Sequence, residues 1–123
     1  MKTNAEGLEL IALFKDEYEP AESRTSAEKA VTILVTRRMT TNQFSALVSL
    51  VMHIGIDTFR RSRMLTMINT RSLHSMVQAA DEFDLYVYID DDHGRRVLDP
   101  FLVRQREFEK ALFLKPELVR KRK

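Results

Sequence analysis

A group of short polar and basic side chains follows residue 70 at spacings that place them on the solvent side of a predicted helix. Arginine can form a bidentate contact with guanine, and glutamine can pair with adenine, in a major groove about 12 Å wide. This chemistry predicts that the segment reads base edges in double-stranded DNA. The residues expected to face DNA from this helix are Thr70, Arg71, Ser72, His74, Ser75 and Gln78.

Two further basic groups lie on either side of that segment. Arg60, Arg61 and Arg63 precede it and can anchor phosphates, although the same residues can equally cover a solvated surface helix. Arg95 and Arg96 follow it in a predicted hairpin, where they either clamp DNA or stay exposed without a partner. We expect the first three to contact phosphates and the second pair to contact DNA as well.

The length and composition indicate one compact domain. The chain has 123 residues, of which 44% are hydrophobic and 31% charged, a balance typical of globular proteins. There is no cysteine, which excludes disulfides and thiol nucleophiles and is compatible with a reducing compartment. No apolar run reaches the roughly 20 residues of a membrane span, and the start does not resemble a signal peptide. We therefore expect a cytoplasmic protein without a membrane partner.

Charge is segregated along the chain, although the net charge is only +2. Residues 1–29 carry a net charge of −3, residues 30–78 carry +5, residues 79–99 carry −5 and residues 100–123 carry +5. A basic middle is the electrostatic footprint that nucleic-acid binding requires. The acidic block beside it would repel phosphate, which leaves a protein-interaction function open.

The elements that must position these residues are mostly helices. Capping-box pairs occur at Thr25 with Glu28 and at Thr40 with Gln43, and the second opens an amphipathic helix that Gly55 can end. Asp57 can cap the following helix. We expect helices over residues 6–18, 27–39, 40–55, 57–68 and 70–80, with the segment 27–39 open to a strand interpretation because it is rich in β-branched residues.

The periodicity then changes to that of strands. Residues 85–89 and 95–98 are strand-like and enclose a turn that contains Gly94, which predicts a β-hairpin. Pro100 can start a last helix. Asn69, which tolerates a left-handed backbone, is expected in the turn before the proposed reading helix. A helix pair followed by a hairpin has the order of a helix-turn-helix with a wing.

The motifs resemble those of one family. The stretch Gln43-Phe44-Ser45-Ala46-Leu47, the Ser/Thr-rich start at Thr70, and the Asp-rich hairpin followed by Arg95-Arg96 are similar to the MarR family of winged-helix regulators and its SarA branch. The resemblance spans roughly residues 27–114. It implies a homodimer with interlocked terminal helices that binds a pseudo-palindromic operator, with Asp92 as an orienting partner of a wing arginine.

We therefore expect a mainly α fold with a β-hairpin wing (α+β), a winged helix-turn-helix that dimerises through its N- and C-terminal helices. The single domain, 1–123, would comprise a dimerisation helix and loop (1–26), the helix-turn-helix and wing (27–99), and a last helix with a basic tail (100–123). Apolar residues on the terminal helices are expected to form the dimer interface: Leu10, Phe14, Tyr18, Phe101, Phe108 and Leu112.

The expected function is sequence-specific DNA binding by a homodimeric transcription regulator, with an unidentified small-molecule effector as a further possible partner. The alternative is a winged-helix adaptor or inhibitor that does not read DNA. No catalytic signature occurs, so no enzyme, cofactor or metal site is expected. The acidic turn at Asp90-Asp91-Asp92-His93 lacks the spaced ligands of a calcium loop, and His53 is expected to be structural.

Overall fold

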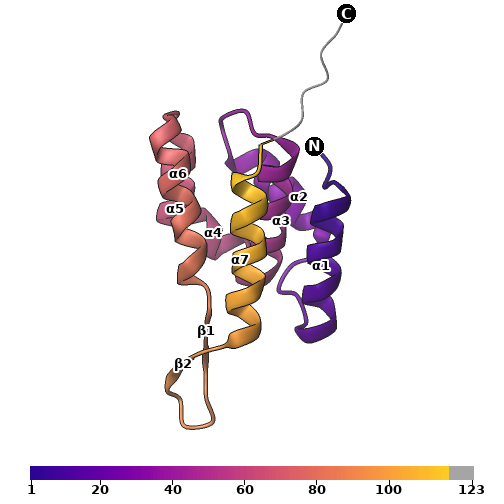
Figure 1. Ribbon diagram of the computed structural model, residues 1–123, viewed down its shortest axis with the longest axis vertical. Helices are drawn as coiled ribbons and strands as arrows, with labels where there is room; N and C mark the ends of the chain where they lie inside the picture. The colour runs from indigo at the N-terminus through magenta and orange to yellow at the C-terminus, as the bar shows by residue number, and fades with distance from the viewer. Residues whose placement is uncertain (117–123) are drawn as a thin grey trace, which may run out of the picture.

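The computed structural model describes residues 1–116 of the chain. Figure 1 shows the longer helices lying side by side and a β-hairpin that projects from one end of the molecule. Within the described residues no helix is both long and apolar enough to cross a membrane. The elements are α1 (Ala5–Glu17), α2 (Arg24–Leu34), α3 (Thr41–Ile54), α4 (Ile56–Arg60), α5 (Arg63–Asn69), α6 (Leu73–Asp81), the 3₁₀ helix η1 (Glu82–Leu85), β1 (Tyr88–Asp90), β2 (Arg96–Leu98) and α7 (Pro100–Leu114).

Helix α3 is the centre of the fold. Its predicted start is confirmed, because the backbone N–H of Gln43 donates to the side chain of Thr40 and the backbone N–H of Thr40 donates to the Gln43 side-chain oxygen. The predicted end is confirmed as well, because Gly55 adopts a φ of 88° that side chains disfavour. Helices α1, α2 and α7 all pack against α3, so ten of its residues are buried.

Helix α1 is held against α3 by a close backbone approach. Asn4 caps the helix by accepting from the backbone N–H of Gly7, and the Asn4 side-chain amide donates to Asn42 on α3 at 2.7 Å. A Cβ atom at Gly7 would collide with the Cβ of Ser45. Glycine at this position therefore lets the two helices meet.

Helix α2 confirms the helical interpretation of its segment, but its bounds differ from those predicted. The cap is Ser23, whose hydroxyl accepts from Ser26, and not the expected pair of Thr25 with Glu28. The carboxylate of Glu28 instead accepts hydrogen bonds from Thr3. The helix ends at Leu34, five residues before the predicted end, and Thr40 then begins the next cap.

The middle of the chain forms three short helices instead of the two expected. Ser62 and Ser72 cap α5 and α6, whereas Asp57 lies within the first turn of α4 and caps nothing. The left-handed residue of the α5–α6 turn is Arg71, with a φ of 64°, and not Asn69. The Asn69 side chain instead donates to the carbonyl of Leu34, the last residue of α2, and accepts from the backbone N–H of Thr36 just after it.

A hairpin is confirmed, with Tyr88 opposite Leu98 and Asp90 opposite Arg96 in an antiparallel register, but its first strand begins at Tyr88 and not at Leu85, which ends η1. The predicted start of α7 at Pro100 is confirmed too, with Asp99 as its cap. The hairpin nevertheless does not act as a wing. It continues from the end of α6 through η1, so the start of α6 and the hairpin tip lie at opposite ends of the molecule (Figure 1).

The terminal helices also differ from the predicted dimerisation arms. Leu10, Phe14 and Leu112 are at most 7% exposed within this single chain, because α1 and α7 pack on α3 and on each other. These three side chains belong to the core of the single chain, whereas the dimer prediction required them to be exposed for contact with a second chain. The expected basic tail after residue 116 lies outside the described residues.

Candidate functional site

A hollow of about 330 Å³ lies between the end of α3 and the hairpin. It combines aromatic surface with several polar groups that converge on one space, the usual composition of a small-ligand site. We call it the hairpin pocket. Its wall includes His53, Ile54, Tyr86, Tyr88, Asp90 and Arg96.

The hairpin is stiffened by its own turn. The Asp91 carboxylate accepts from the backbone N–H groups of His93 and Arg95 and pairs with the Arg95 side chain at 3.1 Å. The hydrogen bond from the Arg95 backbone lowers the pKa of Asp91 most strongly; desolvation opposes it, and the hydrogen bonds from the His93 backbone and the Arg95 side chain lower the pKa further. Gly94 supplies the positive φ of the turn. Because Asp91 holds Arg95, the next residue, Arg96, is placed at the pocket.

Two tyrosines and one arginine make the pocket wall formed by this segment. The guanidinium of Arg96 lies 4.3 Å from the ring centre of Tyr88, a cation–π distance. Burial, with a smaller contribution from Glu82, raises the pKa of the half-buried Tyr86, so its phenol remains protonated near neutral pH. Tyr88 is 43% exposed and presents ring surface to a ligand.

Aromatic side chains from three elements meet behind the pocket. The ring centre of His53 lies 5.2 Å from that of Phe14 and 6.4 Å from that of Tyr18. Phe101, at the start of α7, lies 5.5 Å from Tyr18. The ring of His53 is therefore confined on its α1 side by aromatic contacts.

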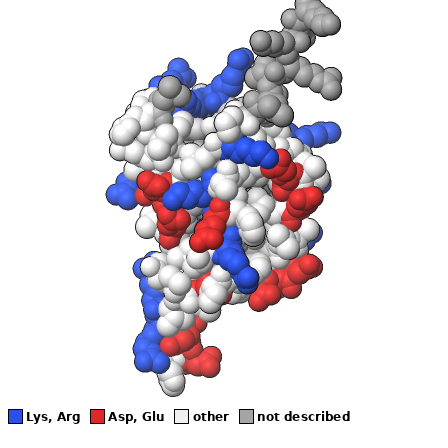
Figure 2. Space-filling model, viewed as in Figure 1, with Lys and Arg blue, Asp and Glu red and all other residues white. Residues whose placement is uncertain are grey.

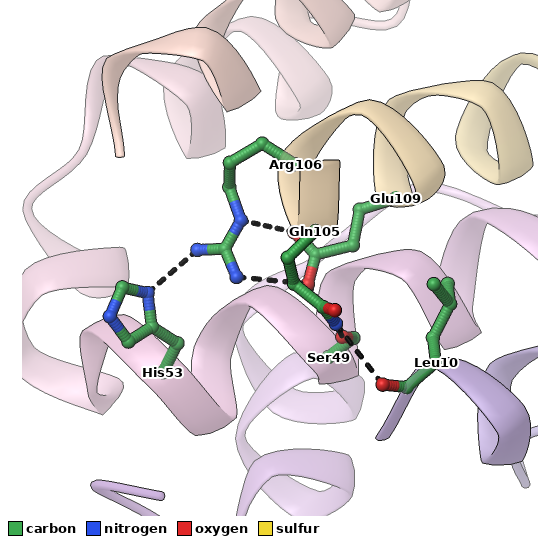
Figure 3. A network of polar contacts seen from close by, with 6 residues as sticks. All are labelled: Leu10, Ser49, His53, Gln105, Arg106 and Glu109. Carbon is green, nitrogen blue, oxygen red and sulfur yellow. Dashed lines mark hydrogen bonds and ion pairs between the residues drawn. The ribbon is translucent and has the colours of Figure 1, made fainter. Parts of the chain in front are cut away.

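A buried polar network supports His53 from the side of α7 (Figure 3). Arg106 Nη1 lies 2.7 Å from His53 Nδ1, and Arg106 Nε lies 2.7 Å from Glu109 Oε1 in an ion pair. Both charged side chains are fully buried. Desolvation lowers the pKa of Arg106 and raises that of Glu109, while their mutual attraction opposes both shifts.

Helix α3 and α1 complete this network. Ser49 donates its hydroxyl hydrogen to Glu109 Oε2 at 2.5 Å, and the Gln105 amide donates to Ser49 at 3.2 Å and to the carbonyl of Leu10 at 3.1 Å. The network thus ties α1, α3 and α7 together beside the pocket. Burial, followed by the charge of Arg106, lowers the pKa of His53 to about 4, so the imidazole is neutral near pH 7.

A larger hollow of about 400 Å³ lies between α1 and α7 and includes Leu13 and Phe108. Its lining is mostly apolar, and the ion pair of Glu6 with Lys115 at 2.8 Å lies at its polar part. It lacks the convergence of polar groups found at the hairpin pocket. Phe108 is 54% exposed there, the one predicted interface residue with a largely exposed side chain.

The arginines predicted to anchor phosphates are held by acidic or backbone groups. Arg60 pairs with Asp57 at 2.7 Å, and Arg63 forms two hydrogen bonds, at 2.9 and 3.0 Å, with the buried carboxylate of Glu82. The hydrogen bond to Glu82 raises the pKa of Arg63. Arg61 donates to the backbone of α4. Arg63 is therefore a structural clamp between α5 and the α6–η1 junction.

The predicted reading residues belong mainly to helix caps. Thr70 donates to the carbonyl of Thr66, and Ser72 and Ser75 form a reciprocal capping box at the start of α6. Arg71 donates to the carbonyl of Thr36. His74 and Gln78 are exposed. Of the expected buried face of α6, Met76 and Ala80 are buried and Val77 is 58% exposed; the side chain of Leu73 lies outside the described residues.

The structure brings together residues that the sequence prediction did not select. Only Arg96 of the predicted DNA contacts lines the hairpin pocket. Tyr86, Tyr88 and Asp90 were predicted only as strand and turn residues, and no role was predicted for Arg106 or Glu109. The alternation of Tyr86 with Tyr88 places both on one face of an extended segment and was the available signal for the pocket. Within residues 1–116 no group of acidic and histidine residues forms a metal site.

Comparison with known proteins identifies the fold. The sequence matches the family described as Phage lysozyme over residues 3–109. The muramidase domain of SpmX from Asticaccaulis excentricus is 26% identical, with a TM-score of 0.79, over 94% of this chain and 99% of that one. No curated protein matches the chain.

Two further solved structures share the fold. An endolysin from Escherichia coli O157:H7 phage FAHEc1 is 18% identical, with a TM-score of 0.79, over 93% of this chain and 94% of that one. A mutant of P22 lysozyme is 24% identical, with a TM-score of 0.71, over 94% of this chain and 99% of that one. At these identities the likeness concerns the fold.

These matches overturn the winged-helix interpretation. The resemblance to MarR and SarA regulators is wrong, and so are the inferred DNA-binding transcription regulator, its operator and its homodimer. The adaptor alternative is not supported either. The expectation that the chain is not an enzyme is also contradicted, because the matched family and structures are lysozymes, a muramidase and an endolysin. The winged-helix fold and the lysozyme-like fold share the order of several helices followed by a hairpin.

Proposed function

We propose that this chain, which belongs to the phage lysozyme family, acts on peptidoglycan as a muramidase and binds a glycan strand in the hairpin pocket. The observation that carries the proposal is the family match over residues 3–109. The SpmX muramidase domain, similar over nearly its whole length, supports it.

The chemistry of the hairpin pocket suits a sugar. Sugar rings have apolar C–H faces and a rim of hydroxyl groups, so they bind to aromatic surfaces flanked by polar groups. Tyr88 offers an exposed ring, while Arg96 and Asp90 offer a hydrogen-bond donor and acceptors beside it. Tyr86 and His53 add polar atoms at the half-buried part of the same wall.

Cleavage of a glycosidic bond requires more than binding. Glycosidases commonly use two carboxyl groups that flank the scissile bond, about 5–10 Å apart. Among the pocket-lining residues that the structure describes, Asp90 is the one carboxylate. We assign it one of the two roles. Tyr18, whose ring lies 6.4 Å from that of His53, is flanked in sequence by Glu17 and Glu19, the candidates for the second role.

Binding and cleavage are measured on the same material. Purified peptidoglycan sacculi are incubated with the chain, the bound protein is recovered by sedimentation, and the soluble fragments are separated by chromatography. We expect wild-type protein to sediment with sacculi and to release fragments with new reducing ends. Asp90→Asn should abolish release while sedimentation persists, and Glu17→Gln and Glu19→Gln are compared in the same way.

The outcomes separate the parts of the proposal. Release that Asp90→Asn leaves unchanged would remove Asp90 from the reaction. Sedimentation by wild-type protein without any release would keep the glycan as the ligand and refute hydrolysis. If wild-type protein neither sediments with sacculi nor releases fragments, the proposed function as a whole is refuted.

A further inference from the structure

His53 connects the buried network to the hairpin pocket. It lies on the last turn of α3, is partly exposed, and lines the pocket. One ring nitrogen, Nδ1, is 2.7 Å from Arg106 Nη1. Figure 3 shows the other ring nitrogen directed away from Arg106 and its partners.

The partner of Nδ1 decides where the proton of the imidazole lies. A guanidinium has only donors and remains charged in proteins, so Nδ1 must accept from Arg106. A neutral imidazole carries one proton, and that proton is then on Nε2. The ring therefore has a fixed tautomer whose N–H is free of the network drawn in Figure 3.

Arg106 cannot easily turn away from His53. Its Nε lies 2.7 Å from Glu109 Oε1, and its Nη2 donates to Glu109 Oε2 at 3.2 Å. Glu109 is itself fixed by the hydroxyl of Ser49. The guanidinium is thus held at both ends, and Phe14 and Tyr18 confine the imidazole from α1.

We infer that His53 presents its Nε2–H as a preset hydrogen-bond donor to an acceptor oxygen of the bound sugar, and that Arg106 and Glu109 are its positioning residues. The inference rests on the proposed function for the identity of the ligand. A neutral donor matches a hydroxyl or acetamido carbonyl oxygen. Of the charged groups around His53, Arg106 borders it on its α7 side, and Asp90 and Arg96 line the same pocket.

The first test is made without a ligand. Long-range ¹H–¹⁵N correlation spectra of the ¹⁵N-labelled full chain report which ring nitrogen of each histidine is protonated. We expect the Nε2–H tautomer for His53 from pH 5.5 to 8. A His53 ring that is protonated at Nδ1 instead, or that carries both protons across this pH range, would overturn the inference.

The second test uses binding to purified sacculi. His53→Phe keeps an aromatic ring and removes the donor, and we expect about three- to tenfold weaker binding, the factor that corresponds to one hydrogen bond. The matched control is His74→Phe on α6, which should bind as wild type does. Unchanged binding by folded His53→Phe would overturn the role of the donor.

A positioning role differs from a purely structural one in its spectroscopic effect. Arg106→Gln should allow the Nδ1–H tautomer of His53 and raise its pKa, and an unchanged tautomer and pKa in a folded Arg106→Gln protein would refute positioning by Arg106. If Arg106→Gln does not fold, Glu109→Gln is examined for the same signals. Failure of wild-type protein to bind sacculi would refute the proposed function and the sugar contact, while the tautomer result would still decide the positioning by Arg106.

Discussion

Arg106 and Glu109 form an ion pair one helical turn apart, with 2.7 Å between Nε and Oε1 and no solvent exposure of either side chain. Both lie on α7, yet both face α3 and not solvent. A buried charge is tolerated when an opposite charge and further hydrogen bonds surround it. Ser49 and His53 provide these hydrogen bonds, so the pair and its neighbours stabilise the structure as a unit.

Removal of one charge from this pair should be strongly destabilising. Glu109→Gln keeps the shape of the side chain but leaves the guanidinium of Arg106 buried without a counter-ion. We expect the free energy of unfolding to fall by about 3–5 kcal/mol, measured by urea denaturation. The double variant Arg106→Met with Glu109→Leu removes both charges and should lose clearly less. A loss below about 0.5 kcal/mol for Glu109→Gln would show that the pair is not buried as described.

His53 should make stability dependent on pH. Its pKa is about 4 in the folded chain against an ordinary value of 6.5, so between these values the unfolded chain binds the proton more tightly. Stability is therefore complete above about pH 6.5 and declines as the pH falls toward 4. Because the ring is partly exposed, we expect a loss of about 1–2 kcal/mol.

The control for this dependence is His53→Asn, which cannot titrate. Denaturant unfolding of both proteins is followed between pH 4 and 7.5. The difference in unfolding free energy between wild type and His53→Asn should shrink as the pH is lowered through this window. A difference that stays constant would contradict the depressed pKa.

Gly7 should be intolerant of the smallest side chain. Alanine normally stabilises a helix by about 1 kcal/mol relative to glycine, but a Cβ at Gly7 would overlap Ser45 of α3. We expect Gly7→Ala to lower thermal stability, with a cost of about 1–3 kcal/mol from the forced shift of α1. Glu9→Ala, at an exposed position of the same helix, is the matched control and should be nearly neutral. A stabilised Gly7→Ala protein would refute the close approach of α1 and α3.

Neighbouring arginines of the hairpin should differ in their importance for glycan binding. Arg96 lies over Tyr88 at the pocket, whereas Arg95 is paired with Asp91 in the turn. We expect Arg96→Ala and Tyr88→Ala to weaken sedimentation with sacculi by about three- to thirtyfold, and Arg95→Ala to have little effect. Equal losses for Arg95→Ala and Arg96→Ala would point to a general effect of positive charge instead of a pocket.

Local signals in the sequence predicted most elements correctly. The capping box at Thr40, the glycine at position 55 and the change to strand periodicity near Tyr86 each depend on residues close together in the chain. The helix cap at Ser23 was missed because serine and threonine compete for the same role within three residues. The left-handed position moved from Asn69 to Arg71 because the Asn69 amide bonds to the segment after α2, a contact between residues far apart in sequence.

The family and the site were beyond these local signals. A helix-rich chain with one hairpin is compatible with a winged helix and with a lysozyme-like fold. The two folds differ in which helix lies at the centre of the packing, and in this chain α1, α2 and α7 surround α3. The spacing of Arg106 and Glu109 is that of an ordinary surface ion pair on a helix, so it does not indicate burial. Their burial depends on Ser49 and His53, which are more than 50 residues away in sequence.

The proposed glycan site is tested most directly by chemical-shift mapping with a soluble oligosaccharide of N-acetylated sugars. We expect the largest shifts of backbone and side-chain signals at His53, Tyr88 and Arg96, and we expect them to saturate with one common affinity. Shifts confined to the groove between α1 and α7, or no shifts at millimolar oligosaccharide, would contradict it.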